Sequence, residues 1–95
     1  MSKQIAVSGE FTIFNAIALR EKFLSALNET DSLEVDLSQV SEIDSTGVQL
    51  MLAAQREAEE RQKGLYFTHL SPVVADVLAL TDLSASFAPP LQSPA

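Results

Sequence analysis

Apolar residues recur along the chain with two different spacings, and segments of the two kinds alternate. In residues 33–37 every second position is apolar, which is typical of a strand that buries one face. Residues 3–11, which Gly9 interrupts, predict one or two further short strands, and residues 65–68 and 83–87 predict two more.

Three segments between these strands have apolar residues three or four positions apart, which is the period of an amphipathic helix. The first segment follows Asn15, a residue type that caps helices. The second extends from Val48 to Arg61. Ser71-Pro72 opens the third, because a capping hydroxyl there precedes a proline suited to the first helical position. The predicted apolar face of the first helix comprises Ala16, Leu19, Phe23, Ala26 and Leu27.

Polar and glycine-containing segments separate these elements. Residues 28–32 form a turn cluster, and residues 38–43 predict a connecting loop with two apolar anchors, Val40 and Ile43. Gly64 suits the left-handed position that follows the end of a helix. The second helix is therefore expected to end just before this glycine.

Strands and helices that alternate in this way predict a single small α/β domain, with helices packed against a mostly parallel sheet of four to five strands. The domain is expected to span residues 1–88. Residues 89–95, which contain three prolines, are expected to form a flexible C-terminal tail. The phenylalanines are core candidates, although Phe14 could also lie in an exposed loop. They are Phe11, Phe14, Phe23, Phe67 and Phe87.

The turn Asp44-Ser45-Thr46-Gly47 places two hydroxyls at the start of the second helix. The first N–H groups of a helix have no partner within it, and the helix dipole makes this end partly positive. A hydroxyl at this end can cap the helix, and it can also carry a phosphate that the site tolerates. In sheets of this kind, the loops at the carboxyl ends of the strands form the binding edge. The residues alone therefore leave two roles open for the turn, a cap and a switch.

The stretch from Glu34 to Val48 resembles the signature of STAS domains, the family of anti-sigma factor antagonists. That signature is a strand ending in Asp-Leu, a short loop, and Asp-Ser/Thr-Ser/Thr-Gly at the start of a helix. Gly9-Glu10-Phe11 resembles the early Gly-Glu-Leu of these domains, and residues 71–87 resemble their closing helix. The resemblance thus covers nearly the whole chain, in the same order and spacing.

Two positions depart from the family pattern. Val48 replaces the leucine that commonly follows the motif glycine. Thr12-Ile13-Phe14 stands where many antagonists have a turn that contains aspartate. The second departure falls on a segment that contacts the partner in such proteins.

The resemblance implies a role for each residue of the turn. In partner-switching members of the family, a partner serine kinase phosphorylates the first hydroxyl after the motif aspartate, which here is Ser45. Thr46 matches the second hydroxyl, which resembles support for the helix start more than the main acceptor, and it is only a secondary phosphorylation site. The unphosphorylated antagonist binds the kinase/anti-sigma factor, the phosphorylated form does not, and a phosphatase restores binding. The implied partner-binding residues are Asp44, Ser45, Thr46, Gly47 and Val48.

Composition argues against several other classes of protein. Six Lys and Arg against 13 Asp and Glu give a formal charge of −7, which opposes binding to nucleic acid or to anionic lipid. The chain has no cysteine, and its single histidine, His69, has no obvious nucleophile or metal partner nearby and is expected to be structural or at the surface. No catalytic residue, cofactor or metal is therefore expected. No apolar run approaches the roughly 18–20 residues of a membrane helix, and residues 1–4 do not begin a secretory signal. The expectation is a cytoplasmic monomer that is not an enzyme.

Three functions fit this description. The first is an anti-sigma factor antagonist-like regulatory module, switched by phosphorylation at Ser45. The second is a soluble STAS subunit of an ABC-type phospholipid transporter that docks on its ATPase, in which case the turn would line the contact without being phosphorylated. The third is an adaptor in a chemotaxis or stressosome-like signalling assembly.

Overall fold

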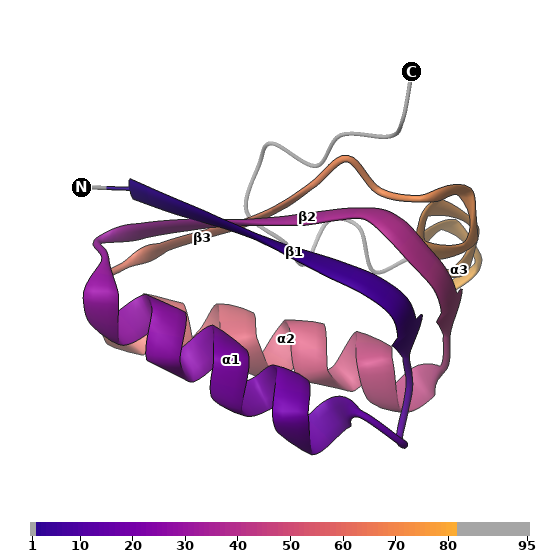
Figure 1. Ribbon diagram of the computed structural model, residues 1–95, viewed down its shortest axis with the longest axis horizontal. Helices are drawn as coiled ribbons and strands as arrows, with labels where there is room; N and C mark the ends of the chain where they lie inside the picture. The colour runs from indigo at the N-terminus through magenta and orange to yellow at the C-terminus, as the bar shows by residue number, and fades with distance from the viewer. Residues whose placement is uncertain (1, 82–95) are drawn as a thin grey trace.

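The computed structural model describes residues 2–81 of the chain, in which strands and helices alternate. Figure 1 shows α1 and α2 side by side on one face of the sheet, and α3 beside the carboxyl end of β2. This arrangement confirms a small α/β domain. The elements are β1 (Ser2–Phe11), α1 (Ala16–Glu29), β2 (Ser32–Ile43), α2 (Ser45–Glu60), β3 (Gly64–Thr68) and α3 (Pro72–Thr81).

The sheet has three strands within residues 2–81, all parallel and in the order β1-β2-β3. The prediction of four to five strands is therefore not met in this part of the chain. Residues 3–11 belong to one strand rather than two, since Gly9 takes a left-handed φ of 76° within β1 without ending it. The predicted strand 83–87, the tail 89–95 and Phe87 lie outside the described residues.

The prediction of a loop at residues 38–43 is wrong, because β2 continues to Ile43. Phe11 pairs with Ile43 in the parallel ladder, and Gly9 pairs with Val40. The register shifts twice along this part of the β1–β2 pair, between Ala6 and Ser8 and again between Gly9 and Glu10. Such irregularities break the regular alternation of buried and exposed residues. The apolar residues at 40 and 43 consequently lack the period of two that identifies a strand.

Three phenylalanines form the centre of the core. The ring of Phe23 meets that of Phe11 edge to face, with 6.1 Å between centroids, and meets that of Phe67 in the same manner at 6.3 Å. All three side chains are fully buried. Their predicted place in the core is confirmed, whereas Phe14 takes the exposed alternative, with 87% of its surface accessible. Leu33, Val35 and Leu37 of β2 are also buried, as their alternation predicts.

The helix ends differ in two details from the sequence-based expectation. Asn15 occupies the residue before α1, but its side chain accepts a hydrogen bond from the backbone N–H of Thr12 and does not cap the helix. At the end of α2, the left-handed residue is Gln62 (φ 58°) and not Gly64.

The end of α2 is closed by two backbone hydrogen bonds. The N–H of Gln62 donates to the carbonyl of Glu59, and the N–H of Lys63 donates to that of Ala58. This is the pattern of a Schellman motif, with glutamine at the position that glycine usually takes. Gly64 instead begins β3, and its N–H donates to the carbonyl of Asp31.

Candidate functional site

The turn predicted as the functional site begins helix α2, and Asp44 caps that helix. The carboxylate Oδ1 of Asp44 accepts a hydrogen bond of 3.0 Å from the backbone N–H of Gly47. Ser45 is the first residue of α2, and its side chain is exposed. Among the described residues, no group hydrogen-bonds the Ser45 hydroxyl. Asp44 thus caps the helix, while the neighbouring Ser45 supplies the accessible hydroxyl.

Asp44 also ties the turn to the β1–α1 loop. Its second oxygen, Oδ2, accepts a hydrogen bond of 3.1 Å from the backbone N–H of Ile13, and its own N–H donates to the carbonyl of Phe11 at 3.4 Å. Hydrogen bonds from the backbone N–H groups hold the pKa of Asp44 below its usual value of 3.8, and the bond from Gly47 contributes more than that from Ile13. The ionised carboxylate therefore stabilises the junction between the two segments.

Loss of this charge is expected to destabilise the protein in acid. Because the pKa of Asp44 is lower in the folded than in the unfolded chain, its contribution to stability is fully present above the usual value of 3.8 and is lost as the pH falls through the lower folded value. The free energy of unfolding, measured by urea titration at several pH values, should therefore decrease less in Asp44→Asn than in the wild type between neutral pH and about pH 3. Equal decreases in the two proteins would contradict this assignment.

Gly47 and Val48 are both buried. A β-carbon built on Gly47 would lie 2.2 Å from the carbonyl oxygen of Phe11 and 3.0 Å from Cγ1 of Ile43. The glycine is therefore required by the close approach of α2 to the end of β1. Thr46, the second predicted hydroxyl, is half-buried.

An open groove of about 510 Å³ lies beside Ser45, between α2 and α3. Its walls are largely apolar, and Val48, Leu52 and Val77 are among the residues that line it. Val77 reaches this groove from α3, a proximity that the local sequence around either helix does not indicate. The lining residues are Ile43, Asp44, Ser45, Val48, Gln49, Leu52 and Val77.

Three large apolar side chains lie exposed on the neighbouring loop and on the first turn of α1. We call Ile13, Phe14 and Ile17 the apolar patch; their exposed fractions are 63%, 87% and 77%. The N–H of Ile13 is the group bound by Asp44, so the patch is fixed next to the Ser45 turn. The sequence signal for it was the apolar pair Ile13-Phe14 in a loop position.

Two carboxylates lie next to each other at the same end of the sheet. Glu10 and Glu42 are partners in the β1–β2 register, and both are exposed. A hydrogen bond with the Glu42 side chain raises the pKa of Glu10 above its usual value, and desolvation and repulsion between the two groups act in the same direction. Neither carboxylate forms an ion pair within residues 2–81.

His69 lies apart from this turn, after β3, with a left-handed φ of 53°. Its Nδ1 lies 3.1 Å from Oγ1 of Thr68, and carboxylate oxygens of Asp36 and Glu34 lie at 3.8 and 3.9 Å. No group of three or more metal-binding side chains that could hold an ion is found in the part of the chain that the structure describes.

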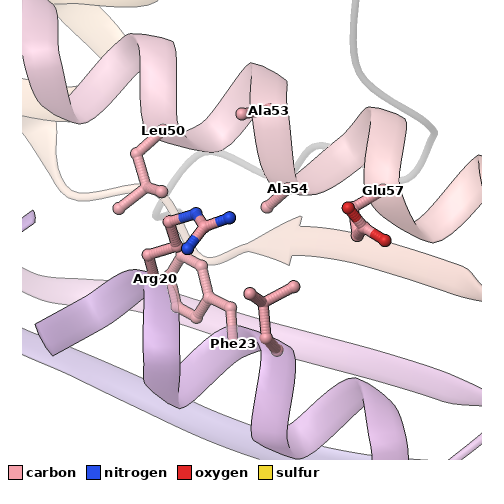
Figure 2. Close-up of a pocket in the computed structure, with 7 residues that line it drawn as sticks. Arg20, Phe23, Leu50, Ala53, Ala54 and Glu57 are labelled. Atoms are coloured by element: carbon pink, nitrogen blue, oxygen red, sulfur yellow. The ribbon is translucent and has the colours of Figure 1, made fainter. Parts of the chain in front are cut away.

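A second hollow, of about 70 Å³, lies between α1 and α2. Figure 2 shows that Arg20 reaches from α1 toward Leu50, while Phe23 forms the floor and Glu57 lies further along α2. This hollow is much smaller than the groove beside Ser45 and shares no lining residue with it. Within residues 2–81, no helix is both long enough and apolar enough to cross a membrane.

The fold and the hydroxyl-bearing helix start define a class of small α/β modules. The family model described as "Mlab, STAS domain" matches residues 2–91. The chain therefore belongs to the STAS domain family. The resemblance identified from the sequence is confirmed. A search of curated proteins gives no significant match.

Solved structures share the fold at low sequence identity. A Thermotoga maritima protein described as a putative anti-sigma factor antagonist is 19% identical, with a TM-score of 0.81 over 99% of this chain and 80% of that one. The anti-sigma factor antagonist SpoIIAA in its unphosphorylated form is 24% identical, with a TM-score of 0.73 over 92% of this chain and 77% of that one. A sulfate transporter family protein from Wolinella succinogenes is 15% identical, with a TM-score of 0.73 over 98% of this chain and 77% of that one.

Proposed function

We propose that this STAS domain is a non-catalytic regulatory module of the cytoplasm, which binds a protein partner through the Ser45 turn and is switched by phosphorylation of Ser45. The observation that carries the proposal is the division of roles in the turn. Asp44 already caps α2, so the exposed Ser45 hydroxyl is not needed for the fold. It lies at the edge of an apolar groove large enough to receive side chains of a partner.

A phosphate on Ser45 would leave the fold nearly unchanged. It adds a charge of about −1.5 to −2, which the start of α2 favours and the nearby carboxylates of Asp44 and Glu42 oppose. The consequence falls on the partner instead. A charge that is desolvated at an interface without a cation costs several kcal/mol. The unphosphorylated form is therefore the one that binds a serine kinase of the anti-sigma factor type, and a phosphatase restores it.

The test compares Ser45→Ala with Ser45→Asp in binding to the partner recovered from native cells. Ser45→Ala should bind as the unmodified wild type does, and Ser45→Asp should bind about 10-fold more weakly or worse, because the carboxylate imitates part of the phosphate charge. Ser25→Asp on the exposed face of α1 is the matched control and should bind normally. Intact-mass measurement of the native protein should show the phosphate. If no phosphate is found and both Ser45 variants bind normally, the switch does not exist.

One observation favours a second candidate, a transporter subunit that docks on an ATPase without phosphorylation. The carboxylates near Ser45 oppose a phosphate, and within residues 2–81 no cation forms an ion pair with Asp44 or Glu42 that would offset them. Recovery of an ATP-binding-cassette subunit in the pull-down would support this candidate, whereas recovery of a serine kinase would support the switch. A chemotaxis or stressosome-like assembly would instead yield a multi-protein signalling complex.

A further inference from the structure

The apolar patch is held in a fixed shape before any partner binds. The Thr12 N–H donates to Oδ1 of Asn15 at 2.9 Å, the Phe14 N–H lies 3.3 Å from Oγ1 of Thr12, and the Ile13 N–H is bound by Asp44. These bonds fix the loop from which Ile13 and Phe14 project. A preordered surface loses little conformational entropy on binding, so exposed aromatic and aliphatic side chains on it are effective anchors.

The border of the patch that faces strands β1 and β2 is negatively charged. Glu10 and Glu42 lie together at the ends of β1 and β2, and the Asp44 carboxylate binds the loop itself. The nearest cation on α1 is Arg20, one turn beyond Ile17, and Figure 2 shows it directed toward Leu50 over the hollow between α1 and α2. The patch is thus apolar at its centre and acidic at one border.

We propose that the apolar patch is a docking surface for a partner segment that presents apolar side chains flanked by Lys or Arg. The apolar side chains cover Phe14 and its neighbours, and the cations meet Glu10 and Glu42. This inference rests on the proposed function, because it extends the partner contact from the Ser45 groove onto the β1–α1 loop. A second copy of the chain does not fit, since a net charge of −7 would bring acidic surfaces together.

The proposal predicts what an unbiased peptide selection returns. The purified domain is used to select from a phage-displayed library of random peptides of about 16 residues, a length that allows a helix of several turns. Selected peptides should combine apolar residues with a net positive charge. Phe14→Ser should weaken their binding about 10-fold or more, as expected for an aromatic anchor. The pair Glu10→Gln and Glu42→Gln should reduce the salt dependence of binding.

Leu80→Ser is the matched control, because Leu80 is 86% exposed on α3 and lies outside the patch. It should leave peptide affinity unchanged. Thermal unfolding checks that each variant is folded, and the 87% exposure of Phe14 implies that its replacement leaves the fold intact. Chemical-shift perturbation in the labelled protein should locate the peptide on residues 13–17.

Several results would overturn the proposal. Neutral or acidic selected peptides would contradict the charge argument, and so would a failure to enrich any peptide over an unrelated acidic domain. Peptides that bind Phe14→Ser normally would contradict the anchor. A wild-type dimer that Phe14→Ser converts to a monomer would assign the patch to a second copy. The peptides are tested on unphosphorylated protein, so this experiment does not depend on the switch. If the patch binds the peptides but the Ser45 variants bind the native partner normally, only the phosphorylation switch is refuted.

Discussion

Replacing Gly47 with alanine is expected to destabilise the protein by about 1–3 kcal/mol, the usual cost of inserting a carbon into filled space. In an exposed helix the same change stabilises by about 0.5–1 kcal/mol, because glycine is a poor helix former. Here the new β-carbon would lie 2.2 Å from the Phe11 carbonyl oxygen, and a backbone atom cannot move aside as a side chain can. Because of this clash, Gly47→Ala should lower the stability of the protein, whereas the same change in an exposed helix raises it.

Urea denaturation of the Gly47 variant measures this effect, and Gly64→Ala is its control. A β-carbon at Gly64 would meet only the distal atoms of the Tyr66 side chain, at 2.9 Å and beyond, and this ring can shift. Gly64→Ala should therefore cost less than Gly47→Ala. Since α2 must withdraw from Phe11 to admit the methyl group, partner binding should also weaken in the Gly47 variant. A stabilised Gly47→Ala protein would show that the two backbones are not in contact.

Replacing Phe23 with alanine is expected to cost about 3–5 kcal/mol, the largest effect of any single change considered. Phe23 is 1% exposed, and its ring lies against those of Phe11 and Phe67, so the variant loses both edge-to-face contacts and leaves a cavity between α1 and the sheet. A small domain has a total stability of roughly 5–15 kcal/mol, so much of it would be lost.

The control for Phe23→Ala is Phe14→Ala, the same chemical change at an exposed position. Its free energy of unfolding should remain within about 0.5 kcal/mol of the wild type. The two variants together separate the structural phenylalanine from the one assigned to partner binding. Equal destabilisation by both changes would mean that Phe14 packs in the core. Phe14 could then not act as an exposed anchor, and the proposed docking surface would be refuted.

The order and type of the elements followed from the sequence, because hydrophobic period and capping chemistry act over short distances. Leu33, Val35 and Leu37 alternate and are buried on β2, and Ser71-Pro72 begins α3 as its residues predict. The Asp44–Gly47 turn was likewise found at the start of α2. Each of these features depends on neighbours within a few positions, so the local sequence contains the information.

Only the tertiary structure decided how the site is assembled. The extension of β2 to Ile43 depends on pairing with β1 across two register shifts, which residues 38–43 do not encode alone. The bond from the Ile13 N–H to Asp44 joins positions 31 residues apart, and Gly47 is required by a carbonyl on β1. Val77 reaches the groove from α3. The sequence determined that Ser45 begins a helix, whereas long-range packing decided that it lies between an apolar groove and a rigid apolar loop.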